Sequence, residues 1–370
     1  MINAFALTRR QMAVLSAGVA GALLCGSALR ALAGEQKNQD ADAAQAQQAG
    51  TPGTVDADGF VLDGTGFPCV KAGTAKTVLT VNSVATEMVL MLGGEGAAAT
   101  LGQGFQYGEN SLNAKMYPNL ADVKTFTRDD CTVENVAAIA PDLVIIDVPE
   151  TVEALRAAGI NAASMAVVSP ETIMQAVDLL GAAMGGEAEQ KAAAYREAYQ
   201  GAIDEVSQLS AELAEDARPS VLYLRGIDST CGLDSMPDNW ITTCGGVNVA
   251  AELGFKGSRA EIGLEAIMDA DPVVIVCESP RTYADLMASE ALSELQAIKN
   301  GTVVIAPLGP VVWSMGSTEA MLQLYWAADL INPQIFDFDV PAITREYFAT
   351  FYGYELTDEE IDEILNPAVA

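Results

Sequence analysis

One pattern of residues occurs twice in the chain and limits its fold more than any other feature. A glutamate opens a short amphipathic helical stretch, a proline follows seven residues after the glutamate, and a buried strand then ends in an acidic residue. The two copies are residues 134–147 (ENVAAIAPDLVIID) and residues 265–278 (EAIMDADPVVIVCE). Agreement in residue type at successive positions indicates two lobes built on one plan.

Short β-branched runs alternate with helical stretches from residue 77 onward. Strands separated by helices usually pair in parallel. The predicted fold is α/β, with two Rossmann-like lobes that contain central, mostly parallel sheets and are joined by one long α-helix. The predicted strands are residues 77–81, 143–147, 163–168, 221–224, 273–277 and 302–306.

A helical region between the two copies predicts how the lobes are connected. Ser169 and Pro170 begin one helix, and Gly185 and Gly186 end it. Residues 187–214 form a stretch rich in Ala, Glu, Gln and Leu, which would extend roughly 40 Å as a helix. This stretch is either a strut between the lobes or an ordinary long surface helix, and its position between the copies favours the strut.

The predicted domain boundaries follow from these features. Thr357, followed three residues later by Glu360, predicts a capping box at the start of the last helix. The predicted divisions are an export signal at 1–33, a flexible leader at 34–75, an N-terminal lobe at 76–185, a connecting helix at 186–217, a C-terminal lobe at 218–332 and a helical tail at 333–370.

The first residues have the pattern of an export signal. Arg9 and Arg10 precede an apolar run at residues 13–24, and residues 31–33 offer a small-x-small cleavage site. Both a twin-arginine signal and a general secretory signal fit this pattern, and lipidation of Cys25 stays open. The predicted location is the periplasm or the outer face of the cytoplasmic membrane.

Acidic residues dominate the composition. The chain has 19 Lys and Arg against 50 Asp and Glu, a net charge of −31, and no His. A field of this sign repels phosphate backbones, which argues against nucleic acid as a partner. Without His and without a CxxC motif, the usual Cys/His zinc sites are excluded.

Five cysteines follow the predicted signal. In an oxidising compartment, Cys231 and Cys244 form the predicted disulfide, and Cys69 with Cys131 is a weaker candidate pair. Cys277 lies in an apolar strand and is expected to be a buried small hydrophobe.

Several segments, in order along the chain, carry a resemblance to a known family. They are TVLTVNSVATEMVLMLG at 77–93, TVENVAAIAPDLVII at 132–146, GGVNVAAELG at 245–254, GLEAIMDADPVVIV at 263–276 and the tail at 313–366. They resemble the periplasmic-binding-protein family of ABC importers for iron-siderophore, haem and cobalamin, in which two lobes are joined by a long helix. The resemblance covers residues 76–367. It implies a ligand held between the lobes, limited closure, and an ABC permease with its ATPase as partners, and we expect a monomer.

The resemblance also implies a docking role for one acidic residue on each lobe. The matching positions are Glu134 and Glu265, which lie at equal distances from Pro141 and Pro272. In this family such residues bind arginines of the permease. Each glutamate could instead only favour a helix N-terminus through the helix dipole, which contributes about 0.3 to 1 kcal/mol.

The ligand is expected beyond the carboxyl ends of the parallel strands, where the two lobes face each other. Aromatic side chains would cover a planar or macrocyclic ligand, and arginines would pair with its oxygens. Any one of the aromatic residues could instead belong to the core. The predicted ligand-binding residues are Tyr107, Phe126, Arg128, Tyr223, Arg225, Trp240, Trp313 and Met315.

The lack of His narrows the choice of ligand. Related importers of bare manganese or zinc hold the ion with imidazoles, so this chain should not belong with them. The expected ligand is an iron chelate, either a ferric siderophore or haem. A corrinoid such as cobalamin is the alternative, as is an envelope protein that retains haem or a metal complex without an importer. If the protein contacts the metal directly, Tyr107 or Tyr223 would supply the donor oxygen.

No motif predicts an enzyme. The glycines at 93–96 follow a helix instead of a strand and lack the full GxGxxG spacing, and neither a Gly-x-Ser-x-Gly sequence nor a P-loop occurs. We therefore expect no catalytic residues and no catalytic cofactor.

Overall fold

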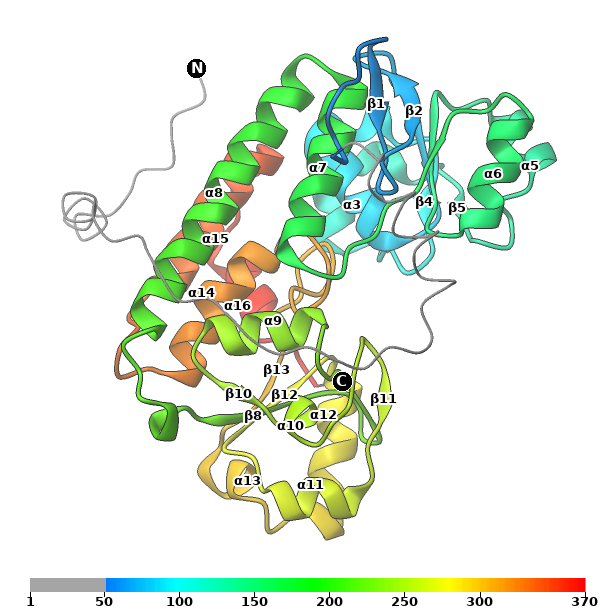
Figure 1. The fold of residues 1–370 in the computed structure, drawn as a ribbon. Coiled ribbons are helices and arrows are strands. Elements are labelled where there is room, and N and C mark those ends of the chain that lie inside the picture. The colour runs from blue at the N-terminus through cyan, green and yellow to red at the C-terminus, as the bar shows by residue number, and fades with distance from the viewer. Residues whose placement is uncertain (1–50, 370) are drawn as a thin grey trace, which may run out of the picture. The chain divides into compact units, whose positions relative to one another are not determined.

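The computed structural model describes residues 51–369, which fold into two α/β lobes connected by helices (Figure 1). The predicted signal at 1–33, with Cys25, and the first part of the predicted leader lie outside the described residues. Among the described residues, no helix combines the length and the apolar character that a membrane crossing requires.

The N-terminal lobe contains a parallel sheet with the strand order β3-β6-β7. A second parallel pair, β4 with β5, lies beside it, and isolated bridges from Val78 to Ala98 and from Asn82 to Gln103 link β3 and its end to the residues on either side of β4. The strands are β3 (Val78–Thr80), β4 (Leu101–Gly102), β5 (Thr125–Phe126), β6 (Leu143–Ile145) and β7 (Ala162–Ala163). The helices are α3 (Ser83–Gly93), η1 (Glu95–Ala97), α4 (Leu112–Met116), η2 (Pro118–Leu120), α5 (Val133–Ile139) and α6 (Pro149–Ala157).

The C-terminal lobe contains a mixed sheet with the order β11-β9-β8-β12-β13, and β10 also pairs with β8. The pairs among β8, β10, β12 and β13 are parallel, whereas β9 and β11 are antiparallel additions at one edge. The strands are β8 (Ser220–Gly226), β9 (Ser229–Thr230), β10 (Val247–Asn248), β11 (Ala260–Glu261), β12 (Val274–Cys277) and β13 (Val303–Ile305). The helices are α9 (Met236–Thr243), α10 (Val249–Glu252), α11 (Leu264–Ala270), α12 (Pro280–Met287), η4 (Glu290–Leu292) and α13 (Gln296–Asn300).

Helix α8 (Glu187–Ser210) is the long connection that the sequence predicts. It packs against α7 (Pro170–Met184), and Gly181 of α7 lies so close to α8 that a Cβ there would be 2.5 Å from the Cβ of Ala192. The chain then passes η3 (Glu215–Ala217) into the second lobe. The tail returns along α8 through α14 (Ala320–Ile331), α15 (Val340–Tyr347), the π-helical turn η5 (Phe348–Tyr352) and α16 (Asp358–Leu365).

Both predicted helix starts are confirmed. Ser169 and Thr172 form a capping box at α7, and Thr357 and Glu360 form one at α16. Each box satisfies backbone N–H groups that the first helical turn leaves without a partner.

The repeated pattern is confirmed in three dimensions. Helices α5 and α11 each carry the repeated glutamate in their first turn and lead into a buried parallel strand, β6 or β12. Only three non-glycine residues among positions 51–369 have a positive φ, and two of them, Ala140 (53°) and Asp271 (36°), end these two helices. Such a left-handed cap costs a non-glycine residue free energy, so its occurrence at both equivalent positions supports a common plan.

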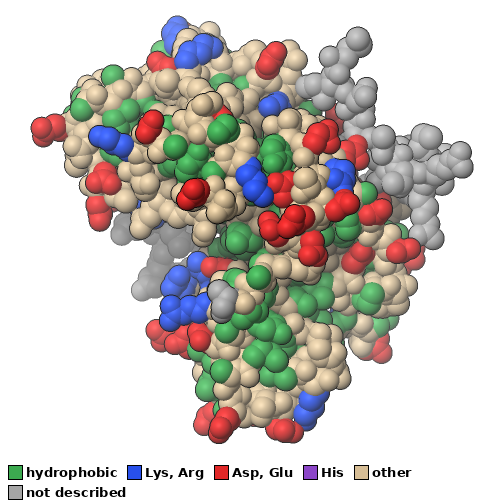
Figure 2. Space-filling model, turned by 180° about the vertical axis from the view of Figure 1, so that it is seen from behind, with side chains coloured by type: hydrophobic (Ala, Val, Ile, Leu, Met, Phe, Trp, Pro, Cys, Tyr) green, Lys and Arg blue, Asp and Glu red, His purple; other side chains and the backbone are tan. Residues whose placement is uncertain are grey.

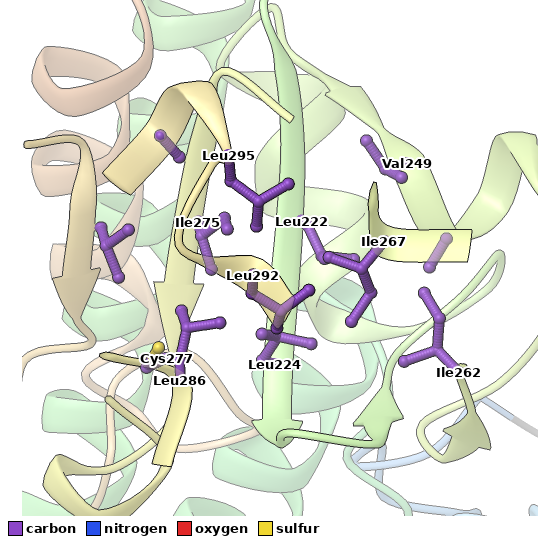
Figure 3. Packing of buried hydrophobic residues seen from close by; sticks show 13 residues of the cluster. Leu222, Leu224, Val249, Ile262, Ile267, Ile275, Cys277, Leu286, Leu292 and Leu295 are labelled. Carbon is purple, nitrogen blue, oxygen red and sulfur yellow. The ribbon is translucent and has the colours of Figure 1, made fainter. Parts of the chain in front are cut away.

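Each lobe has its own apolar core. In the second lobe, Leu222 and Leu224 of β8 and Ile275 and Cys277 of β12 pack against helices on the face shown in Figure 3. Cys277 is fully buried, as predicted. In the first lobe, the core is formed by Leu79, Val81, Phe126, Cys131, Val136, Val144, Ile146, Val152, Leu155 and Ala162.

The prediction of a flexible leader is wrong for the residues from 51 onward. Strands β1 (Phe60–Leu62) and β2 (Pro68–Lys71) form an antiparallel hairpin that packs against α7 and β7. Asp63, between the strands, has no exposed surface, and its Oδ2 lies 2.6 Å from Nη2 of Arg156. The runs FVL and PCV are too short to show a periodic pattern, and distant contacts with the first lobe stabilise them.

The predicted disulfides are also wrong. The five cysteines of the described residues are all free and buried. The thiol of Cys231 donates to the Ser258 carbonyl (3.2 Å), and the thiol of Cys244 donates to the Leu324 carbonyl on α14 (3.4 Å). Packing against these different segments keeps the two sulfur atoms in separate environments.

Acidic side chains are scattered over the surface. Figure 2 shows Asp and Glu at many separate places on the visible face, between larger areas of hydrophobic and other side chains. This distribution agrees with a general solvating role for the negative charge.

Candidate functional site

Two arginines are held by the acids that follow the repeated strands. In the first lobe, Arg128 pairs with Asp147, with Nε–Oδ1 at 2.7 Å and Nη2–Oδ2 at 2.5 Å. The hydrogen bonds from Arg128 lower the pKa of Asp147. The Arg128 side chain is 50% exposed, so its remaining N–H donors can reach a ligand.

The second lobe contains a related pair. Arg225 Nε lies 2.8 Å from Glu278 Oε2, and its Nη1 donates to the Ser258 carbonyl at 3.0 Å. Glu278 follows β12 as Asp147 follows β6, so each repeat ends in an acid that orients an arginine. The sequence predicted both arginines but did not predict these acids as their partners.

Tyr223 lies behind this pair and has no exposed surface. Its hydroxyl group bonds to Glu278 Oε2 (3.0 Å) and Ser314 Oγ (2.8 Å). Burial raises the pKa of Tyr223 well above its ordinary value. Tyr223 therefore supports the position of Glu278, and its hydroxyl group is not available to an incoming ligand.

Three other predicted aromatic residues belong to the interior. Trp240 and Trp313 are almost fully buried, and Phe126 belongs to the core of the first lobe. Trp240 packs edge-to-face on Tyr223, with ring centroids 6.0 Å apart. Trp240 lies in α9 and Phe126 in β5, and each faces the interior. The sequence did not show this, because elements of two to eight residues are too short for a clear periodic pattern.

Tyr107 and Met315 are half-buried. The Tyr107 hydroxyl group donates to the Tyr117 carbonyl at 2.8 Å. Of the eight predicted contact residues, Tyr107, Arg128, Arg225 and Met315 thus retain surface for a ligand.

A pocket of about 220 Å³ lies where segments of both lobes meet the tail. Asn113 connects the lobes there, because its Nδ2 donates to the Gln106 carbonyl (2.8 Å) and to the Pro310 carbonyl (3.1 Å). The sequence did not single out this residue. The lining residues are Gln106, Asn110, Ser111, Leu112, Asn113, Leu308, Gly309, Glu360, Glu363 and Ile364.

Two fully buried glutamates, Glu87 on α3 and Glu319 before α14, were also missed. Burial raises the pKa of Glu87 to about 7. Burial, and then the charge of Glu87, raises the pKa of Glu319 well above its ordinary value. A signal was present in the sequence, since Glu87 is the only charged residue in segment 77–93 and directly precedes the apolar run 88–92.

Glu134 and Glu265 are exposed in the first turns of α5 and α11. None of the ion pairs within residues 51–369 involves either glutamate. Both carboxylates are therefore accessible to a partner.

The part of the chain that the structure describes contains no group of three or more Asp, Glu or Cys side chains that could hold a metal ion.

Comparisons of the sequence and of the fold with known proteins agree with each other. The chain is 28% identical to a periplasmic solute binding protein from Veillonella parvula, with a TM-score of 0.72 over 83% of this chain and 96% of that structure. The fold is shared by the molybdate periplasmic binding protein of a Haemophilus influenzae ABC transporter, at 16% identity and a TM-score of 0.70, covering 80% of this chain and 99% of that one. At this identity the likeness concerns the fold alone.

A curated relative, a cobalamin-binding protein of Halobacterium salinarum, is 29% identical over 178 residues, which cover 46% of each chain. The chain thus matches about half the length of this relative. The model of the family described as periplasmic binding protein matches residues 78–308, from the first strand of one lobe to the end of the other. This match covers more than half of the chain, which therefore belongs to the periplasmic binding protein family.

Proposed function

We propose that this protein is the extracytoplasmic substrate-binding component of an ABC importer and that its ligand is a metal chelate with a complete coordination shell. Family membership implies a binding protein located outside the cytoplasm. The chelate would bind at the facing ends of the two lobes and pass to a permease.

The observation that carries the choice of ligand is the state of the metal donors that the sequence offered. The chain has no His. Of the two tyrosines that could have served, Tyr223 is buried in hydrogen bonds to Glu278 and Ser314, and Tyr107 donates to a backbone carbonyl. Haem iron in proteins is held by an axial His, Cys, Met or Tyr, so the engagement of both tyrosines favours a chelate that fills its own coordination sphere.

A corrinoid is the first candidate, because the curated relative, at 29% identity over 178 residues, is a cobalamin-binding protein. A ferric siderophore is the second. It is favoured by Arg128 and Arg225, whose guanidinium groups keep N–H donors that could bond to the oxygens of an anionic chelate.

The test is a ligand panel of cyanocobalamin, a ferric hydroxamate and haem, measured by native mass spectrometry and by the shift in melting temperature. A ligand at 100 times its dissociation constant should stabilise the protein by about 2.7 kcal/mol. Binding of cyanocobalamin or the ferric hydroxamate supports the proposal, and the two distinguish its candidates. Binding of haem alone, or of none of the three, contradicts it.

A further inference from the structure

The two buried glutamates lie where one lobe, the connecting helix and the tail come together. The Glu87 carboxylate, on α3 of the first lobe, accepts hydrogen bonds from the Thr318 backbone N–H (3.2 Å), the Thr318 hydroxyl group and the Tyr352 hydroxyl group. Thr318 directly precedes Glu319, and Tyr352 ends η5. One carboxylate therefore ties together three segments that are far apart in the sequence.

Glu319 binds the segment that follows β13 of the second lobe. Its Oε1 accepts from Trp313 Nε1 (3.1 Å), and its Oε2 accepts from the Val311 backbone N–H (3.2 Å). Gly309 lies against the same carboxylate, and a Cβ at this position would be 1.9 Å from Oε1. We call Glu87, Thr318, Glu319, Trp313 and Tyr352 the junction cluster.

The groups that surround the cluster are neutral or acidic. The Tyr195 hydroxyl group of α8 donates to the Thr318 carbonyl (2.8 Å), and that of Tyr347 on α15 donates to Thr318 Oγ1 (2.8 Å). Tyr117 faces the same charges from the first lobe. A lysine of α8, Lys191, lies near α3, but its Nζ donates to the Met91 carbonyl (2.8 Å) and forms no ion pair with either glutamate.

No ion pair of residues 51–369 includes Glu87 or Glu319. One turn beyond Glu319, the amide group of Gln323 is also buried without a hydrogen-bond partner. Two charged carboxylates in such a place repel each other and lose hydration, and a neighbouring cation does not compensate them. The cluster is therefore most stable when the pair holds a proton, and its two titrations are linked.

The cluster also controls how the lobes are joined. Gly316, two residues before Thr318, packs so tightly on the first lobe that a Cβ would be 2.6 Å from the Val167 carbonyl oxygen. Thr318 and Gly316 thus attach the segment after β13 to α3 and to the connection between β7 and α7. Separation of Glu87 from Thr318 would free the first of these two attachments.

We propose that Glu87 and Glu319 form a proton-operated latch between the lobes: a proton held by this buried pair keeps α3 attached to the start of α14, and its loss loosens the attachment and widens the range of lobe movement. Ligand capture and release would then depend on the pH outside the cytoplasm.

Two measurements on the purified protein test the latch. Infrared difference spectra from about pH 5 to about pH 9 follow the C=O stretch of buried protonated carboxyl groups. Electron–electron distance measurements follow the lobes, with spin labels on Ala138→Cys and Asp269→Cys, which are exposed equivalent positions of α5 and α11. The five cysteines among residues 51–369 are buried, which limits their labelling.

The latch predicts that the carboxyl band disappears as the pH rises and that the distance distribution broadens over the same interval. In the double variant Glu87→Gln with Glu319→Gln, the band should be missing and the distances should be independent of pH. In Glu87→Gln alone, the remaining titration should move down by about one pH unit or more, because the neighbouring charge is gone. Glu153→Gln, an exposed change on α6, should behave as the parent protein does.

The absence of a titrating band overturns the proposal, and so does a band that titrates without a change in distance. A distance change that persists in the double variant also overturns it. If the double variant does not fold, the parent protein alone provides the test. The latch requires that the infrared carboxyl band and the distance between the spin labels change with the same pH midpoint, and different midpoints overturn it.

Discussion

Glu134 and Glu265 occupy the same position in two equivalent helices. Each lies in the exposed first turn of its helix, α5 or α11, and each helix ends in a left-handed non-glycine residue before a proline and a buried strand. Neither glutamate caps its own helix, since Thr132 provides that bond at α5 and no side chain does so at α11. Two exposed carboxylates without ion pairs, one on each lobe, are the arrangement that a two-fold partner such as a permease could bind.

Replacement of both glutamates by alanine should separate delivery from binding. We expect the double variant to bind its ligand with an unchanged dissociation constant, because the ion pairs that hold Arg128 and Arg225 are formed with Asp147 and Glu278 and do not involve either glutamate. Uptake of the ligand by cells should be lost. Glu150→Ala is a matched control, because Glu150 is also an exposed acid in the first turn of a helix, α6. A weaker affinity in the double variant, or normal uptake, contradicts the docking role.

Arg225→Ala should weaken ligand binding. The change removes a guanidinium group with free N–H donors and leaves Glu278, which also accepts from Tyr223, as an uncompensated charge. A hydrogen bond to a charged group contributes about 1.5 to 3 kcal/mol, so the dissociation constant should rise by about tenfold or more. Titration calorimetry measures this change. Arg281→Ala is the control, since Arg281 is 92% exposed on α12. Equal affinity of the two variants would remove Arg225 from the site.

Tyr223→Phe should instead act on stability. The Tyr223 hydroxyl group is buried between Glu278 and Ser314, so its removal should lower the free energy of unfolding by about 1 kcal/mol. Denaturant unfolding measures this loss. A large loss of affinity with unchanged stability would show that the tyrosine contacts the ligand.

The sequence predicts those features that depend on local patterns. Pro141 and Pro272 mark equivalent strand starts, and Ser169 and Thr357 mark helix starts, because proline geometry and capping act over a few residues. The side-chain partners depend on segments far apart in the chain. Thr318 binds Glu87 only after the lobes and the tail have assembled, and the hairpin at residues 60–71 forms against a distant helix. Burial of Tyr223 has the same origin, which is why half of the predicted contacts proved to be core residues.

The buried glutamates give the stability a specific pH dependence. Burial raises the pKa of Glu87 from the ordinary 4.5 to about 7, so the folded state binds a proton that the unfolded state has lost in this interval. The stability from this proton is fully present below the unfolded pKa and is lost as the pH rises through the folded pKa. The free energy of unfolding should fall by up to about 1.4 kcal/mol per pH unit for one such group.

Denaturant unfolding at several pH values between 4.5 and 7 measures this slope. Glu87→Gln should reduce it, because only Glu319 then binds a proton in the folded state, whereas Glu150→Gln should leave it unchanged. Asp147, whose pKa is lowered by Arg128, acts at more acidic pH and with the opposite sign. Parallel curves for the parent protein and Glu87→Gln would show that Glu87 binds no proton in this interval.

Two glycines provide a matched test of how tightly the junction cluster is packed. At Gly309 a Cβ would lie 1.9 Å from Glu319 Oε1, and this carboxylate cannot move away without breaking its bonds to Trp313 and Val311. Gly309→Ala should therefore lower the free energy of unfolding by about 1 to 3 kcal/mol. Gly201, within α8, has no atom within 4 Å of the same added group, so Gly201→Ala should raise the stability by about 0.5 to 1 kcal/mol. Because the chemical change is the same in both variants, opposite signs in denaturant unfolding isolate the packing around Glu319. A neutral Gly309→Ala would mean that the carboxylate can shift, and the junction would then be looser than its contacts imply.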